Sequence, residues 1–234
     1  SGSSGRLPWH RLGPRPAQGH AGEVLLGGGL RVQIAVEAQF GEAADGGVDC
    51  VVRNPGRQRG FGAGGPHGAV GDAEKGEALA AALGDNAYFC HVDLMDPGQI
   101  ESMVDEAVSS LGGLDILVNN AGITIDKTVI KMSDDDWYKV LNVNLSGAFF
   151  LSQAALRHMA ERGSGRIVNV SSVIGEIGNI GQANYAASKS GLFGLTKTLA
   201  LEATMLLARA GKLNDPEGIG LTINTVTPGF IATE

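Results

Sequence analysis

Apolar and polar residues follow a regular pattern from about residue 74 onward. Residues 74–83 are good helix formers that end at Gly84, a residue typical of helix ends. Residues 88–94 predict a strand, and Asp96-Pro97 then has the residue types of an N-cap and a first helical position. The helix that follows has one apolar face, with residues at spacings of three and four: Ile100, Met103, Val104, Ala107, Val108 and Leu111.

The alternation of strand and helix continues beyond this helix. Ser133 and Asp136 have the spacing of a capping box ahead of a long helix over residues 137–162. Strands that alternate with helices predict an α/β fold, here a Rossmann-like, doubly wound parallel sheet flanked by helices. The remaining elements of this pattern are strands at residues 114–118, 166–170 and 221–226 and a second long helix at residues 184–207.

Residues 1–73 follow a different pattern. Residues 31–40 and 48–53 could each form a strand, but the Gly-, Pro- and Arg-rich segments around them favour loops or disorder. Residues 1–70 hold 17 of the 36 glycines, five of the eight prolines and no lysine. We therefore divide the chain into an atypical segment, 1–73, in place of an expected first βαβ unit, and a Rossmann-like core, 74–234. A shifted reading frame or fusion to unrelated sequence is our hypothesis for this segment.

Composition narrows the classes of function. The chain carries 18 basic and 25 acidic residues, a formal net charge of −7, which argues against nucleic acid as the main partner. No run of about 18 apolar residues predicts a membrane span. Cys50 and Cys90 lack the spacing of a zinc site. We expect no metal site, no membrane partner and a cytoplasmic location.

The strongest chemical signal is the sequence Tyr185-Ala-Ala-Ser-Lys189. Residues at positions i and i+4 share one face of a helix. An ammonium group beside a phenol favours the phenolate, so we expect Lys189 to lower the pKa of Tyr185. Such a tyrosine can act as a general acid or base near neutral pH. Taken alone, the pair is a weak signal, and a chance surface pair is the better interpretation.

Small and polar residues follow three of the predicted strands. Ser171 and Ser172 follow the strand at 166–170, and Pro228-Gly229 follow the strand at 221–226. The sequence Asn119-Asn120-Ala121-Gly122 follows the strand at 114–118. Open α/β sheets bind ligands in the crevice beyond the carboxyl ends of their strands, so these groups predict a ligand site there. Ser171 could be only a hydroxyl at a strand end, and Ser172 is the better candidate for contact with a substrate oxygen.

Together these motifs resemble the short-chain dehydrogenase/reductase family over about residues 74–234. Three longer strings, LVNNAGITID, GQANYAASK and TPGFIAT, are similar to those of 3-oxoacyl-acyl-carrier-protein reductases and of the related acetoacetyl-CoA reductases. The motifs that carry the resemblance are Asp93, Asn119 to Gly122, Asn144, Ser172, Tyr185 with Lys189, and Pro228-Gly229.

The resemblance implies a role for each matching residue. Tyr185 would protonate a substrate carbonyl, Ser172 would orient it, and Lys189 would bind the nicotinamide ribose. Asn144 would hold a water in a proton relay. The cofactor would be NADPH or NADH, with NADPH slightly preferred, and it supplies the hydride. The residues implied to contact it are Asp93, Asn120, Ala121, Gly122, Tyr185, Lys189, Pro228, Gly229, Ile231 and Thr233.

The resemblance further implies a substrate and an assembly. The substrate would be a 3-oxoacyl thioester, carried on acyl-carrier protein or coenzyme A, and the reaction would be its reduction in fatty acid biosynthesis. The family commonly forms homotetramers through its two long helices, which here correspond to residues 137–162 and 184–207.

Two departures from the family pattern qualify this interpretation. The family begins with a strand and a glycine-rich turn on which the cofactor pyrophosphate sits, and neither Gly27-Gly28-Gly29 nor the glycines of 60–65 have that context. The sequence ends at Glu234, just after TPGFIAT, so we expect a truncated C-terminus. The alternative function is therefore that of an incomplete or non-catalytic chain that serves only as a fold or oligomerisation unit.

Overall fold

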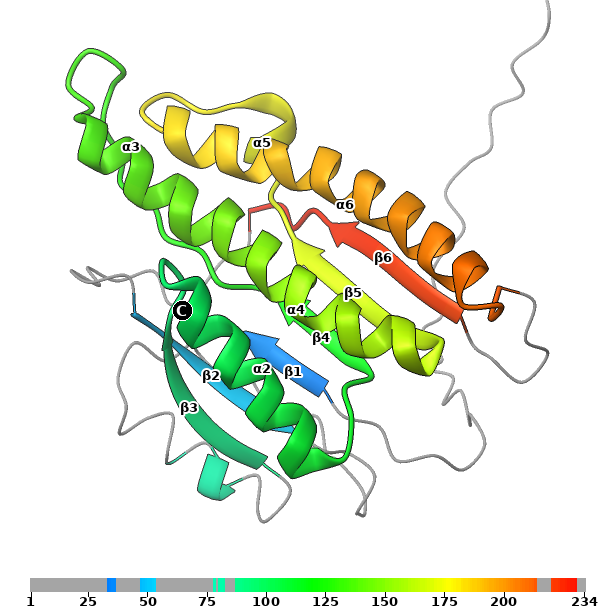
Figure 1. The fold of residues 1–234 in the computed structure, drawn as a ribbon. Helices are drawn as coiled ribbons and strands as arrows, with labels where there is room; N and C mark the ends of the chain where they lie inside the picture. The colour runs from blue at the N-terminus through cyan, green and yellow to red at the C-terminus, as the bar shows by residue number, and fades with distance from the viewer. Residues whose placement is uncertain are drawn as a thin grey trace, which may run out of the picture.

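The computed structural model describes residues 33–36, 47–53, 78, 80–82, 87–213 and 220–230. Within these residues, six strands form one sheet in the order β3-β2-β1-β4-β5-β6 (Figure 1), which is the strand order of a dinucleotide-binding fold. The strands are β1 (Gln33–Val36), β2 (Gly47–Arg53), β3 (Ala87–Asp93), β4 (Ile116–Asn119), β5 (Ser164–Val170) and β6 (Gly220–Val226).

Five of these strands run in one direction, and β2 runs in the other. β1 pairs in parallel with β4, β4 with β5 and β5 with β6, whereas β2 pairs antiparallel with both β1 and β3. Only the ten residues 37–46 join β1 to β2, fewer than the dozen or so that a parallel crossover needs. The predicted parallel sheet is thus confirmed, with β2 as its exception.

The two strands considered in the atypical segment correspond to β1 and β2. The glycine clusters at 27–29 and 60–65 lie outside the described residues. The idea that residues 1–73 stand in place of the first βαβ unit therefore stays a prediction.

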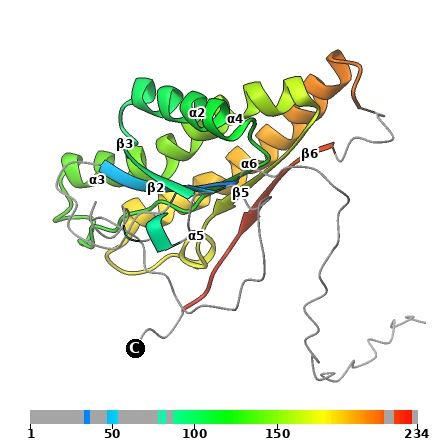
Figure 2. The same cartoon turned by 90° about the horizontal axis from the view of Figure 1, so that it is seen from below.

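Helices α2, α4 and α6 lie side by side on one face of the sheet (Figure 2). The predicted caps are confirmed, since the Asp96 side chain accepts hydrogen bonds from the Gly98 and Gln99 amides at the start of α2. Ser133 and Asp136 form the expected capping box. The helices are α2 (Pro97–Leu111), α3 (Asp134–Leu141), α4 (Gly147–Arg162), α5 (Ile174–Ile177) and α6 (Ala183–Arg209).

The long helix predicted over residues 137–162 contains a π-helical turn. This turn, η2 (Asn142–Ser146), lies between α3 and α4, and the apolar pattern does not reveal it. π turns inside α-helices occur frequently at functional sites. Here the turn contains Asn144, whose side chain is buried.

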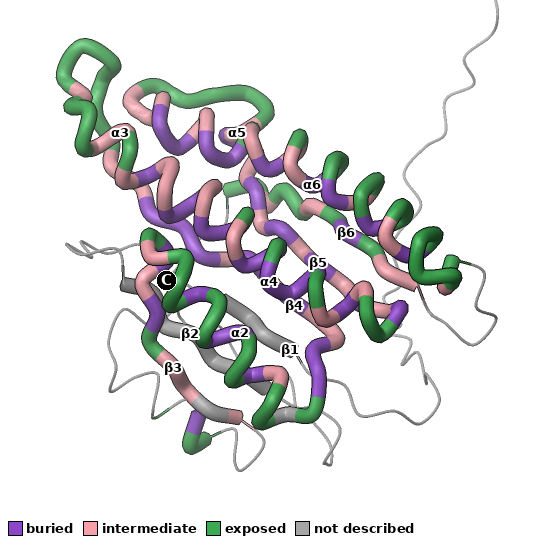
Figure 3. The backbone as a smooth tube through the Cα atoms, in the orientation of Figure 1, coloured by how far each residue is buried: buried purple, intermediate pink, exposed green. Residues whose placement is uncertain are grey.

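The core lies between the sheet and helices α2, α4 and α6, whose inner sides are buried (Figure 3). The predicted apolar face of α2 is confirmed, because Ile100, Met103, Val104 and Ala107 are all buried. Packing is close at Gly147, where an added Cβ would lie 3.0 Å from the Leu94 side chain. The largest fully buried side chains are Leu94, Ile100, Leu114, Leu117, Leu151, Met159, Ile167 and Leu192.

Helix α6 has 27 residues and is, among the described helices, the one long and apolar enough by composition to cross a membrane. Long core helices satisfy the same criterion. In this fold α6 packs against β6, α3 and α5.

Candidate active site

A cleft of about 540 Å³ opens where β4, β5 and β6 end. The residues that follow these strands form its floor, and the first turns of α6 form one wall. As the parallel strand direction predicts, the motifs after the three strands meet at one edge of the sheet. Seven of the predicted site residues line the cleft: Asn120, Gly122, Ser172, Tyr185, Lys189, Pro228 and Gly229.

Two backbone hydrogen bonds hold the floor of the cleft together. The Ser171 amide donates to the Val226 carbonyl at 2.8 Å, and the Val173 amide donates to the Pro228 carbonyl at 3.0 Å. The loops after β5 and β6 are therefore fixed to each other just beyond the sheet.

Tyr185 lies in the first turn of α6 and is 8% exposed. Its side chain has a hydrogen bond with Ser172, which favours the phenolate. Burial has the opposite and larger effect, and the negative charge of Asp126 also disfavours the phenolate. The pKa of Tyr185 is therefore raised above its ordinary value. The expected lowering of this pKa by Lys189 is thus wrong for this structure.

The geometry of Lys189 explains that correction. Its Nζ donates to the Val170 carbonyl at 2.8 Å and lies 5.7 Å from the centre of the Tyr185 ring. The ammonium is therefore directed at the end of β5 rather than bonded to the phenol oxygen. Lys189 is 3% exposed, and this burial lowers its own pKa to about 8.

Asn144 lies behind the cleft floor and is buried. Its Oδ1 accepts from the Ile123 amide at 2.8 Å, and its Nδ2 donates to the Ile123 carbonyl at 3.0 Å and to the Ser188 Oγ at 3.1 Å. The π turn thus aims one amide at the segment that follows β4 and at α6. The predicted role of Asn144 in a proton relay stays a prediction.

The two neighbouring serines differ in their contacts. The Ser171 hydroxyl donates to the Lys189 carbonyl at 2.7 Å and is buried, so it fixes α6 to the end of β5. The Ser172 Oγ accepts from the Ile174 amide at 3.2 Å, which leaves its hydrogen for the Tyr185 oxygen. The preference for Ser172 over Ser171 as the reactive hydroxyl therefore agrees with their geometry.

Two of the described residues that were predicted to contact the cofactor, Asp93 and Ala121, are not among those that line the cleft. Asp93 ends β3, where its Oδ1 accepts from the Met95 amide at 2.8 Å, and Ala121 is buried beneath the floor. Ile231 and Thr233 lie outside the described residues. The roles given to all four stay predictions.

Several other lining residues were not predicted, among them Thr124, Asn179, Gln182 and Phe230. Gln182 is the most informative, because its Nε2 donates to both carboxylate oxygens of Asp126, at 3.0 and 3.1 Å. Thr124 and Gln182 lie within the strings LVNNAGITID and GQANYAASK. Both residues thus belong to strings that carry the family resemblance, but only the fold shows that the two strings lie next to each other.

Comparisons with known proteins agree with this geometry. A family model described as short chain dehydrogenase matches residues 59–234. A 3-oxoacyl-[acyl-carrier-protein] reductase of Haemophilus influenzae is 42% identical over 163 residues, which are 69% of this chain and 62% of that protein. Proteins of the same description from Vibrio cholerae and Escherichia coli are 43% and 41% identical over 152 and 158 residues.

The matches cover most of this chain but a smaller share of each relative. The matched residues make up 65% and 68% of this chain for the Vibrio cholerae and Escherichia coli proteins. The chain spans 57–62% of the length of these curated relatives. Because the family model covers most of this chain, the conclusion is that the chain belongs to the short-chain dehydrogenase family.

Proposed function

We propose that this chain reduces the ketone of a 3-oxoacyl thioester to a hydroxyl group, with NAD(P)H as the reductant. The observation that carries the proposal is the meeting of Tyr185, Ser172 and Lys189 in one cleft at the carboxyl ends of β4, β5 and β6. The family and the names of the matched relatives support the reaction type and the substrate class.

In this proposal Tyr185 is the general acid. Its raised pKa keeps the phenol protonated at neutral pH, so that it can donate its proton to the carbonyl oxygen as charge develops there. Ser172 donates a hydrogen bond to the same oxygen and orients the ketone. After the transfer, Lys189 places a positive charge 5.7 Å from the centre of the Tyr185 ring.

In this proposal the cleft also holds a nicotinamide cofactor, which would supply the hydride. At Gly122 an added Cβ would lie 3.1 Å from the Lys189 Nζ and 3.5 Å from the Asn144 Oδ1, so only glycine leaves this part of the floor open. An ammonium has three N–H donors, of which the Val170 carbonyl takes one. Lys189 would bind the ribose hydroxyls, and Asn120, Gly122, Pro228 and Gly229 would line the cofactor.

The carrier, compartment and assembly form a second part of the proposal. The relatives' names support the reduction of a substrate carried on acyl-carrier protein. We extend the proposal to NADPH as the preferred cofactor and to a role in cytoplasmic fatty acid biosynthesis. Large apolar side chains are exposed on α3, α4 and α6, including Tyr138 at 61% and Leu201 at 74%. Such surfaces support a homo-oligomer built on these helices, and light scattering of the purified chain tests it.

Cofactor binding is the first test of the proposal. NADPH and NADH are titrated separately into the protein, and the nucleotide fluorescence is followed. We expect saturable binding at micromolar concentrations. An absence of binding at millimolar concentrations would contradict the proposal and favour a non-catalytic chain that serves as a fold or oligomerisation unit.

The Tyr185→Phe substitution tests the mechanism. It removes the proton donor but keeps the ring, so we expect kcat with acetoacetyl-CoA to fall by about 10²–10⁴-fold with unchanged NADPH affinity. Tyr138→Phe is the matched control, since Tyr138 is exposed on α3. Survival of activity in Tyr185→Phe would overturn the assigned mechanism.

A further inference from the structure

A buried asparagine to which the mechanism gives no role lies next to the candidate acid. Asn184 precedes Tyr185 in the first turn of α6, and none of its surface is exposed. A buried amide that crosses between elements is costly unless all its hydrogen bonds are made.

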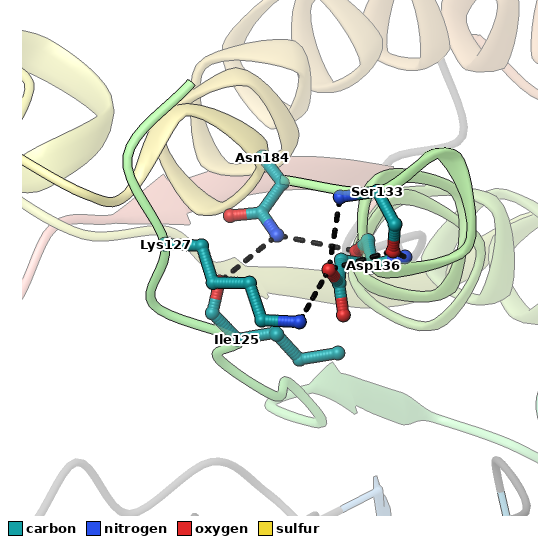
Figure 4. A network of polar contacts seen from close by, with 5 residues as sticks. All are labelled: Ile125, Lys127, Ser133, Asp136 and Asn184. Atoms are coloured by element: carbon teal, nitrogen blue, oxygen red, sulfur yellow. Dashed lines mark hydrogen bonds and ion pairs between the residues drawn. The ribbon is translucent and has the colours of Figure 1, made fainter. Parts of the chain in front are cut away.

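Asn184 makes those bonds to three different segments. Its Nδ2 donates to the carbonyl of Ile125 and to the carbonyl of Asp136, both at 3.2 Å. Its Oδ1 accepts from the Tyr185 amide at 2.7 Å. Figure 4 shows this amide between the segment that follows β4 and the start of α3. One side chain therefore joins α6, α3 and the loop that forms the cleft floor.

The bond to Tyr185 meets a need of the helix itself. The first amides of a helix have no partner within it, and the residue before α6, Gln182, makes no side-chain cap. Asn184 satisfies the Tyr185 amide in its place. The main chain of the candidate acid is thus held by a side chain anchored outside its own helix.

The anchor is itself fixed by charge and hydrogen bonds. Asp136 Oδ2 accepts from Lys127 Nζ at 2.7 Å, from Ser133 Oγ at 2.7 Å and from the Ser133 amide at 3.0 Å. The Lys127 amide also donates to the Gly181 carbonyl at 2.8 Å. The carbonyls that receive Asn184 therefore belong to a segment and a helix end that are held in place.

Asn144 and Asn184 hold the same segment at two points. Asn144 bonds both the amide and the carbonyl of Ile123, and Asn184 bonds the carbonyl of Ile125. Between them lies Thr124, which lines the cleft. Both asparagines thus connect the cleft floor to α6, Asn184 from within the helix and Asn144 through Ser188.

We propose that Asn184 is a positioning residue, which ties the Tyr185 main chain to the segment of Ile123 to Ile125 and so sets the reach of the phenol into the cleft. Its effect on catalysis rests on the proposed reductase function. The connection between Asn184 and the Tyr185 main chain does not rest on that function, because it consists of hydrogen bonds that can be measured in the free protein.

The catalytic test compares Asn184→Ala and Asn184→Leu with the wild-type chain, using acetoacetyl-CoA and NADPH. Misplacement of a reacting group by about 1 Å can cost 10²-fold in rate, so we expect kcat to fall by about 10–100-fold while NADPH affinity stays unchanged. The leucine variant fills the volume, which separates lost hydrogen bonds from a cavity. Leu199→Ala is the control, because Leu199 is a buried residue of the same helix and its truncation also costs stability.

The outcomes of this test are distinct. A fall in kcat in both Asn184 variants, but not in Leu199→Ala at equal loss of thermal stability, supports positioning. Rates within about twofold of wild type in both Asn184 variants, or an equal fall in Leu199→Ala, would overturn it.

A second measurement does not depend on activity. The chain has three tyrosines, so protein labelled with ¹⁵N-tyrosine gives three amide signals, assigned with Tyr88→Phe and Tyr138→Phe. We expect Asn184→Ala to speed hydrogen exchange of the Tyr185 amide by about tenfold or more, with the Tyr138 amide unchanged. Unchanged exchange at Tyr185 would overturn the tie. If the wild-type chain is inactive but Tyr185 exchange is faster in Asn184→Ala, the proposed function fails. The connection between Asn184 and the Tyr185 main chain is then still supported.

Discussion

The half of the sheet made of β4, β5 and β6 differs from the half made of β1, β2 and β3 in strand direction. In the first half all the strands end at the cleft. In the second half β2 is reversed, so that its last residue, Arg53, pairs with Ala87 at the start of β3. The chain after β2 therefore leaves the sheet at the edge away from the cleft. Parallel strands all end at the same edge of the sheet, so the residues that follow them can meet in one site. A reversed strand ends at the opposite edge, and the residues that follow it cannot join that site.

The first half also carries a layer of buried polar residues beneath the cleft. Asn119, Asn169 and the residue Thr225 lie opposite one another in neighbouring strands. Asn119 Nδ2 donates to Asn169 Oδ1, and Asn169 Nδ2 donates to Thr196 Oγ1, both at 2.8 Å. Asn169 directly precedes Val170, whose carbonyl holds Lys189. Polar residues at the end of β4 and one position before the ends of β5 and β6 thus support the residues that line the site.

The largest expected effect is that of Lys189→Met in this half. Loss of the ammonium should lower kcat by at least about 10³-fold. The same change should stabilise the fold at pH 7, because it removes a buried charge. The downward pKa shift of Lys189, from 10.5 to about 8, sets an upper limit of about 3 kcal/mol on this gain, from which the lost bond to Val170 subtracts. Urea unfolding and steady-state kinetics measure the two effects.

The pH dependence of unfolding gives this prediction a sign. A lysine whose pKa is lower in the folded state than in the unfolded state destabilises the fold while it is charged. That penalty is present in full below pH 8 and is relieved as pH rises from about 8 to 10.5. Wild-type stability should therefore gain over this range relative to Lys189→Met. A constant difference between the two proteins across the range would contradict the assigned burial of the charge.

A smaller effect is expected from Gly122→Ala at the cleft floor. The new Cβ would lie 3.1 Å from the Lys189 Nζ, so the ammonium must shift from its position against β5. We expect kcat to fall by about 10–100-fold with little loss of stability. Gly194→Ala is the control, since an added Cβ there meets nothing within 4 Å. Equal kinetics in the two variants would show that the floor at Gly122 has room to spare.

The sequence predicts the fold best where local chemistry decides the structure. The box of Ser133 and Asp136, the cap at Asp96 and the apolar face of α2 depend on neighbours three or four residues apart, and all are confirmed. The grouping of motifs at one sheet edge is also predictable, because parallel strands end on the same side.

What the sequence does not predict depends on contacts between distant segments. The π turn at Asn144 is stabilised by bonds to Ile123 and Ser188, which lie 21 and 44 residues away. The direction of the Tyr185 pKa shift depends on burial in the folded chain rather than on the spacing to Lys189. The reversal of β2 follows from the short connection between β1 and β2, and the composition of residues 1–73 does not predict the length of that connection.

Stability distinguishes the two halves of the sheet through a pair of truncations. Asn169→Ala would remove one hydrogen bond from Asn119 and one from Thr196, and Val104→Ala would open a cavity under α2. Each should lower the free energy of unfolding by about 2–3 kcal/mol. Only Asn169→Ala should also weaken NADPH binding, because it acts next to Val170. If both variants bind NADPH equally well, the polar layer does not support the cleft.

The smallest expected effect is a gain in stability from Gly194→Ala. Gly194 lies in the interior of α6 with open space around it, so alanine should raise the free energy of unfolding by about 0.5–1 kcal/mol through helix propensity. Gly194 shares its helix face with the exposed Leu201 and Met205, which follow at spacings of seven and eleven residues. If this face packs against a second copy of the chain, the added methyl group meets that copy and the gain becomes a loss. Urea unfolding at low and high protein concentration therefore measures the propensity of one helix and tests whether its outer face is covered.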